Sequence, residues 1–246
     1  MTVRRIQHIM LLLVGWSLIL GSVRLSAQAL GGFPGLVRVP TADFKRDGTF
    51  YTGGSFLPKE RLAYSNYQRD AFSIFASFTF LPFMEIDLRL TKQLNMPEGA
   101  NHTMDRSPSL RLKVLRERGI FPAMVLGVHD FIATADEGSS RHFAASYLVL
   151  TKRLYLPVAR VSPTLGYSFP IFKKQSYEFL AWFAGVKVQP YALRWMAIVM
   201  DYDSAEFNVG IDVYPLPWIQ VKCALLDRQY FTFNTSMHFN LFRVFK

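Results

Sequence analysis

Strict alternation of apolar and polar side chains is the feature that most limits how this chain of 246 residues can fold. In residues 231–241, phenylalanine, methionine or leucine occupies all odd positions but one, and threonine, asparagine, serine or histidine occupies every even position. Successive side chains of a β-strand point to opposite faces, so this pattern predicts a strand with one apolar and one polar face.

The same alternation recurs in segments of about ten residues along most of the chain. Counting back from the last strand gives twelve segments, the first at residues 61–67. A further candidate strand at residues 49–56 makes the number odd and contains Gly53 and Gly54, which weaken a strand interior. We therefore expect twelve strands within a range of 10 to 14, with fourteen arising if residues 49–56 pair with a strand near 36–39.

The connectors between these segments are of two alternating kinds. Short connectors rich in proline and aromatic residues are 81–83, 119–122, 155–157, 189–191 and 214–218. Polar and in places longer connectors are 93–107, 133–141, 169–176, 201–206 and 227–229. Outer-membrane barrels have tight turns on the periplasmic side and larger loops outside, so the alternation predicts both the fold and its orientation.

Residues 1–29 have the pattern of a cleaved secretory signal peptide. Arg4 and Arg5 precede an apolar core that ends before the small-residue site Ala27-Gln28-Ala29, and cleavage is expected after Ala29. An anchoring helix would need roughly 20 apolar residues, more than this run contains. The lone cysteine, Cys223, excludes an internal disulfide, a cysteine-based zinc cluster and a lipoprotein anchor.

Composition restricts the fold class further. Half of the residues are hydrophobic and 15% are aromatic, yet after residue 29 no apolar stretch approaches the length of a membrane helix. Only helices and closed barrels satisfy every backbone group within a bilayer, so a membrane location implies a barrel. The competing interpretation is a soluble secreted β-sandwich, which uses the same alternation.

We therefore predict an all-β protein, an antiparallel transmembrane up-and-down β-barrel in the outer membrane of a Gram-negative bacterium. The expected organisation is a signal peptide at 1–29, an N-terminal lead or plug with one candidate strand at 30–57, and the barrel at 58–246. Residues 30–246 carry a net charge of about +7, because the leader contains three of the 28 basic residues and none of the 18 acids. Since these charges are scattered and the chain is exported, lipid headgroups or an anionic polymer are expected partners, and nucleic acid is not.

Polar positions of the alternating segments supply candidate lumen-lining residues. These are Arg61, Glu85, Asp87, Arg89, Arg111 and Lys113. Opposite charges at inward positions of neighbouring strands either pair as a structural network that fills a narrow barrel or form a polar lining that contacts a sugar polymer. Both interpretations predict the same inward direction.

Aromatic residues beside the turns supply a candidate girdle at the membrane interface. They are Tyr155, Trp182, Tyr191, Trp195, Tyr214 and Trp218, which we expect at the periplasmic end. Stacking on sugar rings is the alternative role for these side chains.

No catalytic, cofactor-binding or metal site is predicted. A lipid-modifying enzyme would need His and Ser, with or without an acid, at the outer rim. The available side chains are His129, Asp130, His142, Ser146 and His238. Adjacent residues such as His129 and Asp130 point to opposite faces of a strand and form no direct dyad. The loop acids Asp136 and Glu137 lack a calcium-loop template, and no two histidines have the spacing of a preformed metal site.

A set of motifs that follow one another in the expected order along the chain resembles the YjbH-like outer-membrane proteins. The opening motif is residues 35–43 (GLVRVPTAD), followed by Asp47-Gly48-Thr49. The others are 81–85, 105–107, 122–127 with Asp130-Phe131, 147–153, 208–210 and 215–218. The resemblance implies an outer-membrane barrel associated with exopolysaccharide or capsule production or export. The resemblance implies that longer family members carry substantially more chain, corresponding to a second barrel, whereas one barrel is expected here, so a role that needs two barrels acting together is not expected.

The expected function is therefore an accessory or scaffold component of exopolysaccharide or capsule biosynthesis or secretion, with a narrow or plugged lumen. The interior of a barrel of about 8 strands is filled by side chains, and a barrel of 16 to 18 strands encloses an aqueous channel. A barrel of twelve strands lies between these two cases. The alternatives are a small-solute or polymer porin and an outer-membrane lipid-modifying enzyme. Expected partners are outer-membrane lipids, an anionic polysaccharide, export-machinery proteins and, during assembly, the outer-membrane insertion machinery.

Overall fold

The computed structural model describes residues 28–62, 69–95, 104–131, 143–171 and 178–244. Thirteen β-strands, two short 3-10 helices and a terminal helical turn make up its regular structure. The first strands are β1 (Thr49–Leu57), β2 (Ala71–Phe80), β3 (Met84–Gln93), β4 (Asp105–Leu115), β5 (Ala123–His129), β6 (Ala145–Thr151) and β7 (Leu154–Tyr155). The others are β8 (Ala159–Ser168), β9 (Ala181–Pro190), β10 (Met196–Tyr202), β11 (Phe207–Leu216), β12 (Ile219–Leu226) and β13 (Tyr230–Asn240). The helical turns are η1 (Lys59–Arg61), η2 (Tyr191–Leu193) and α2 (Leu241–Val244).

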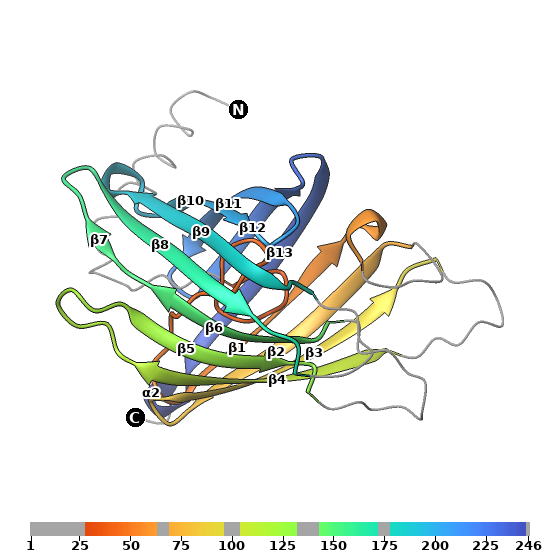
Figure 1. The fold of residues 1–246 in the computed structure, drawn as a ribbon, viewed down its shortest axis with the longest axis horizontal. Helices are drawn as coiled ribbons and strands as arrows, with labels where there is room; N and C mark the ends of the chain where they lie inside the picture. Colours follow the sequence, from red (N-terminus) through yellow and green to blue (C-terminus); the bar gives the residue numbers. More distant parts are fainter. Residues whose placement is uncertain (1–27, 63–68, 96–103, 132–142, 172–177, 245–246) are drawn as a thin grey trace, which may run out of the picture.

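The strands form one closed antiparallel barrel (Figure 1). Neighbours in sequence pair with one another, and β1 pairs with β13 to close the sheet. Both β6 and β7 pair with β8, so they act as one strand interrupted at Lys152 and Arg153. The barrel therefore has twelve strands, and the prediction of a twelve-stranded antiparallel barrel is confirmed.

The first strand differs from the predicted one. It is β1, whereas Lys59–Arg61 form a 3-10 turn and residues 63–68 lie outside the described residues. Gly53 fits within β1 because a Cβ there would lie 2.2 Å from the Thr235 carbonyl oxygen of β13 and 2.6 Å from the Phe75 ring of β2. The close approach of three strands thus explains a glycine that the sequence suggested would weaken a strand.

The two faces of the wall differ as the alternation predicts. On β3, Ile86 and Leu88 point outward and are 47% and 44% exposed, whereas Glu85 and Asp87 point inward and are 0% and 4% exposed. Large apolar side chains are exposed in the same way on most of the remaining strands. No helix among the described residues is long and apolar enough to cross a membrane.

The two kinds of connector lie at opposite ends of the barrel. The tight turns that follow β2, β4, β7, β9 and β11 lie at one end, here called the short-turn end. The longer polar connectors lie at the other, here called the long-loop end. Thr49 of β1 pairs with Asn240 of β13, so the barrel also begins and ends at the short-turn end.

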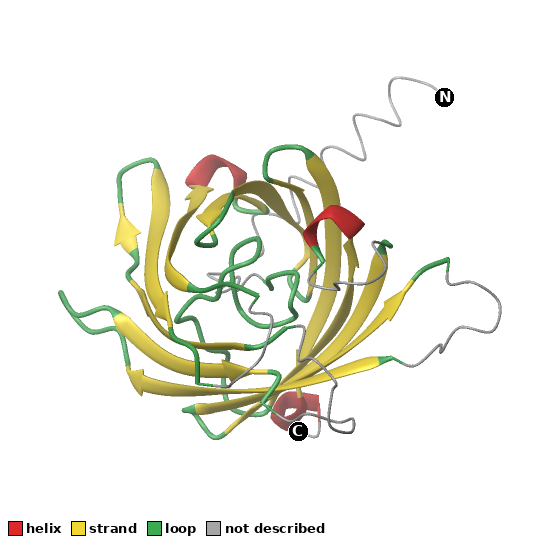
Figure 2. Cartoon of the chain, turned by 45° about the vertical axis from the view of Figure 1, so that its right-hand side comes forward, coloured by secondary structure: helices red, strands yellow, loops and turns green. Residues whose placement is uncertain are grey.

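Residues 28–47, here called the plug, lie inside the barrel (Figure 2). The plug folds on itself through hydrogen bonds from the Leu30 N–H to the Val37 carbonyl (2.9 Å) and from the Leu36 N–H to the Val39 carbonyl (3.0 Å). Its apolar side chains form a buried core with inward side chains of the wall. The range 30–57 therefore contains both an internal plug and the complete first strand.

Candidate functional site: the plugged lumen

The plug enters and leaves the lumen at the same end. At its start, the Gln28 N–H donates to Gln220 Oε1 near the short-turn end of β12 (2.7 Å). The Leu30 carbonyl accepts from Ser55 in the half of β1 nearer the long loops (2.8 Å). At its other end, Asn240 Nδ2 donates to the Asp47 carbonyl just before β1 (2.8 Å). The plug is thus a loop that rises into the barrel and returns.

One carboxylate on β10 holds the tip of the plug. Asp201 Oδ2 accepts the consecutive backbone N–H groups of Val37, Arg38 and Val39 at 2.7, 2.8 and 3.2 Å. Asp201 Oδ1 accepts from Asn208 of β11 (2.8 Å), which fixes the carboxylate. The plug backbone is irregular here and would otherwise leave these three N–H groups without partners. This single side chain satisfies all three.

Two cations extend the attachment. Arg38 Nη1 lies 2.8 Å from Asp203 Oδ2, directly after β10. On β12, Lys222 Nζ donates to the Leu36 carbonyl and lies 3.2 Å from Asp212 Oδ1 of β11. We call Asp201, Asp203, Gln220 and Lys222 the anchoring wall, since each binds a polar group of the plug.

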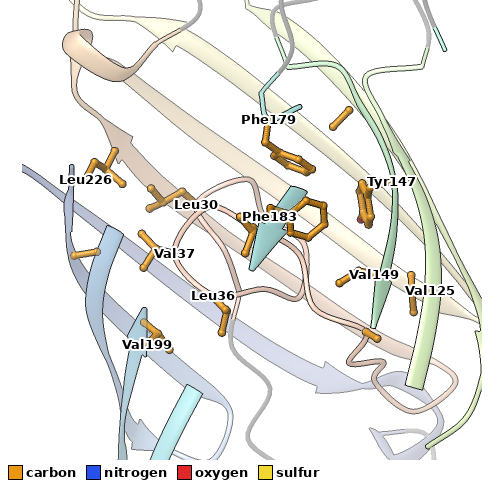
Figure 3. Packing of buried hydrophobic residues seen from close by; sticks show 14 of the residues in the cluster. Leu30, Leu36, Val37, Val125, Tyr147, Val149, Phe179, Phe183, Val199 and Leu226 are labelled. Atoms are coloured by element: carbon orange, nitrogen blue, oxygen red, sulfur yellow. The ribbon is translucent and has the colours of Figure 1, made fainter. Parts of the chain in front are cut away.

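Apolar contacts complete this attachment (Figure 3). Leu36 and Val37 are buried in the same cluster as Phe183 of β9 and Val199 of β10. A Cβ on Gly185 of β9 would lie 2.3 Å from Leu36 Cδ1 and 2.5 Å from the Met200 carbonyl oxygen. Gly185 therefore lets the plug approach the backbone of the wall.

A second polar contact lies on β3 and β4 toward the short-turn end. Arg111 Nη1 pairs with Glu85 Oε1 (2.5 Å), and Tyr51 of β1 donates to the other oxygen of Glu85. Arg111 Nη2 also donates to the Thr41 carbonyl of the plug (2.5 Å). Arg111 and Lys222 are both 0% exposed, whereas charged side chains that lined a water-filled channel would remain wet. The middle of the lumen is filled.

The inward faces of β2 to β5 differ beyond Glu85 and Arg111, toward the long-loop end. Among the described residues, nine buried polar atoms on these faces and on Glu178 have no hydrogen-bond partner. They are Ser73 Oγ, Asp87 Oδ1 and Oδ2, Arg89 Nε, Thr91 Oγ1, Gln93 Oε1, Ser107 Oγ, His129 Nδ1 and Glu178 Oε2. We call Ser73, Asp87, Arg89, Thr91, Ser107 and His129 the outer β2–β5 wall.

The structure brings together only part of the predicted lumen set. Glu85 and Arg111 pair with each other, whereas Arg89 pairs with Glu178 (3.3 Å), which the sequence did not suggest. Asp87 is buried on the outer β2–β5 wall.

The other two predicted lumen residues lie near the ends of the barrel. Lys113 lies at the short-turn end, where its Nζ donates to the Pro82 carbonyl (2.6 Å). Arg61 lies on η1 rather than on a strand, and it pairs at the long-loop end with Glu206 and, at 2.6 Å, with Asp227. Its placement on a first strand is therefore corrected.

The predicted aromatic girdle also requires corrections. Tyr155, Tyr191, Trp195 and Trp218 are exposed at or near the short-turn end. Trp182 is exposed too, but it lies at the start of β9 at the long-loop end, where it contacts Tyr167. Tyr214 is only 5% exposed and accepts a hydrogen bond from Lys187 Nζ inside the barrel (2.7 Å), because it shares the inward face of β11 with Asp212.

The possible catalytic side chains form no assembled site among the described residues. His129 Nε2 lies 3.0 Å from the Tyr147 hydroxyl, and the Asp130 carboxylate accepts from the Phe143 N–H (3.4 Å). Ser146 is buried, and His238 lies near the opposite end of the barrel. His142, Asp136 and Glu137 lie outside the described residues. Within the described ranges, no group of three His, Cys, Asp or Glu side chains is placed to hold a metal.

Sequence reasoning missed the anchoring wall. Asp201 was assigned to a connector, and Gln220 and Lys222 belong to a segment whose apolar residues obscured its inward face. Parity along the strands was the available indication: Asp212 and Tyr214 share one face of β11, as Gln220 and Lys222 share one face of β12. No sequence pattern indicated that the backbone of residues 36–39 would be their partner.

Comparison with protein-family models gives a match that covers the N-terminal part of the barrel. The family model YjbH, described as "Exopolysaccharide biosynthesis protein YbjH", matches residues 27–174, more than half of the chain. The matched range includes the whole plug and strands β1 to β8. A search of curated proteins found no match. The chain belongs to the YjbH family of exopolysaccharide biosynthesis proteins.

Proposed function

We propose that this protein is an outer-membrane β-barrel that acts as a non-catalytic accessory or scaffold component in exopolysaccharide biosynthesis or secretion. The closed barrel and its apolar exterior support the membrane location, because exposed Ile, Leu, Phe and Trp side chains suit acyl chains better than water. The family match supports the connection with exopolysaccharide. The long loops then face outside and the short turns face the periplasm.

The filled lumen is the observation that carries the accessory role. An open porin of this size would have a wet inner wall, whereas here the plug and the inward side chains bury one another. The resting protein therefore conducts little. This argues against the porin alternative, and the scattered histidines, acids and serine give no support to the lipid-modifying alternative.

The proposed partners follow from location and family. Outer-membrane lipids surround the barrel, and the outer-membrane insertion machinery assembles it after cleavage of the leader. A polysaccharide and proteins of an export machinery are its partners in function. The short-turn end, which carries the highly exposed side chains Ile120, Phe121 and Val158, is the surface available to periplasmic proteins.

Three experiments test this function. The purified full chain, placed in planar bilayers, should show little steady conductance, and Asp201→Ala, which releases the tip of the plug, should increase the frequency of openings. Large steady openings in the unmodified protein would favour the porin.

In a deletion strain, exopolysaccharide output should fall and be restored by the intact gene, while unchanged output would contradict the proposed role. Recovery of the protein in the aqueous fraction without detergent would contradict the membrane location.

A further inference from the structure

The outer β2–β5 wall has a concentration of unsatisfied polar atoms that the rest of the lumen does not explain. Native proteins leave few buried polar groups without partners, and such groups usually indicate a missing water, ion or ligand. Asp87 is the clearest case, since it is 4% exposed and neither carboxylate oxygen has a partner among the described residues. The neighbouring Ser77 hydroxyl donates to the Gly32 carbonyl of the plug (3.3 Å).

These atoms lie close together on adjacent strands. Ser73 pairs in register with Thr91, and Arg89 pairs with Ser107. All four side chains point inward from the half of the barrel nearer the long loops. Phe143 covers Arg89, with the guanidinium carbon 4.0 Å from the ring centroid. The unsatisfied atoms therefore form one continuous surface beneath the long-loop end.

The plug does not satisfy this surface. Near it the plug presents the Phe33 ring, whose centroid lies 4.2 Å from that of His129. A phenylalanine ring has no N–H or O–H donor and no oxygen acceptor, so it cannot satisfy the carboxylates and hydroxyls of this wall. On the anchoring wall, by contrast, the polar side chains bind backbone groups of the plug. The plug can therefore stay attached to one wall while another molecule occupies the space beside the other.

We propose that the outer β2–β5 wall is a saccharide-binding surface that the plug covers in this structure. The carboxylates of Asp87 and Glu178 accept hydrogen bonds from sugar hydroxyls, and Arg89 Nε donates one. The hydroxyls of Ser73, Thr91 and Ser107 can do either. A sugar hydroxyl also donates and accepts, so this mixed set suits a polyhydroxylated ligand. The inference deepens the proposed function by naming the class of polymer.

Charge indicates a neutral saccharide. Arg111 is paired with Glu85 and Arg89 with Glu178, which leaves the carboxylate of Asp87 without an ion pair among the described residues. A uronic acid would bring an unpaired negative charge into this poorly hydrated site, where the guanidinium groups of Arg89 and Arg111 are already paired with Glu178 and Glu85. The anionic polysaccharide expected from the overall basic charge is therefore replaced, at this site, by a neutral sugar chain.

Cysteine labelling of the full chain tests the inference. In a Cys223→Ser background, Ser73→Cys and Ser107→Cys report on the outer β2–β5 wall. Ser55→Cys and Ser236→Cys are matched controls on β1 and β13, where the native serines are similarly buried. A water-soluble methanethiosulfonate should label the first pair at least about tenfold faster, because that side of the plug opens more readily. Equal rates at all four positions would overturn the inference.

Protection by sugars then distinguishes a saccharide from water. Maltohexaose, a neutral probe, should slow labelling at Ser107→Cys by about threefold at a concentration near twice its dissociation constant. Asp87→Ala should remove that protection, and hexagalacturonate should give none. Fast labelling without protection would mean that only water occupies the wall, and protection by the uronate alone would exclude a neutral ligand; either result refutes the proposal. These rates need neither a cell envelope nor polymer output, so they stand apart from the tests of the proposed function.

Discussion

Two walls of the same lumen use similar residues with opposite results. On the anchoring wall, Asp201 and Lys222 bind backbone groups of the plug, and both are nearly inaccessible to water. On the outer β2–β5 wall, Asp87 and Ser107 are equally buried but have no hydrogen-bond partner among the described residues. The presence of buried polar side chains therefore does not by itself show whether a wall holds the plug. A wall holds the plug only where the plug supplies hydrogen-bond partners for these side chains.

The difference has an energetic consequence. A buried polar group that finds a partner contributes modestly to stability, whereas one that finds none costs about 1–3 kcal/mol. The plugged state should therefore be held mainly by the anchoring wall and by Arg111, and opposed by the outer β2–β5 wall. The comparison predicts that the same substitution will have different effects on the two walls.

The largest loss of stability should follow Arg111→Met. This change leaves Glu85 buried without its cation and removes the donor to the Thr41 carbonyl. Breaking a buried ion pair on one side typically costs about 3–5 kcal/mol. Urea unfolding in detergent micelles measures the change, and adding Glu85→Gln to Arg111→Met should recover part of it. A loss below about 1 kcal/mol, the range of exposed pairs, would contradict the filled lumen.

The most direct test of the comparison is the pair Asp201→Ala and Asp87→Ala. The first orphans three buried N–H groups of the plug and should cost about 3 kcal/mol or more. The second removes a carboxylate that has no hydrogen-bond partner and should leave the free energy of unfolding within about 0.5 kcal/mol of the unmodified value, or raise it. Both values come from the same urea titration. Equal losses would remove the distinction between the walls.

Gly185→Ala tests the close packing of the plug on β9. The new methyl group would meet Leu36 Cδ1 and the Met200 carbonyl oxygen, and the backbone atom has little freedom to move. Overpacking of this kind typically costs about 1–3 kcal/mol. Proteolysis of the plug should also increase, which limited digestion followed by mass spectrometry detects. An unchanged digestion pattern and unfolding midpoint would show that the plug does not press on β9.

The smallest effect should be a pH dependence of the returning limb of the plug. Burial by itself would raise the pKa of Asp43, but the Arg153 guanidinium at 2.5 Å outweighs it and holds that pKa below its ordinary value of 3.8. A lowered folded-state pKa stabilises the protein above the ordinary value, and this contribution disappears as the pH falls through the folded-state pKa. The stability difference between the native protein and Asp43→Asn should therefore be constant near pH 7 and shrink below about pH 4. A constant difference down to pH 2 would exclude this ion pair as the source.

Much of the wall was predictable because alternation is a local property. The inward positions of Glu85, Asp87 and Arg89 follow from period two within one segment. The same rule, applied consistently, would have placed Tyr214 inside with Asp212. Position beside a turn was a weaker guide, as Tyr214 and Trp182 show.

The sequence by itself determined a chain of about twelve alternating strands and the inward face of clearly alternating strands such as β3, since these depend on neighbours along the chain. Only the tertiary structure decided that residues 28–47 fill the lumen, that β1 closes the barrel against β13 and that Asp201 binds the backbone of residues 37–39. These contacts join residues more than 150 positions apart, and backbone N–H groups are the same in every residue but proline. Because every residue except proline offers the same backbone N–H group, the sequence of side chains does not show which N–H groups Asp201 will bind. Closure of the barrel around the plug determines that choice.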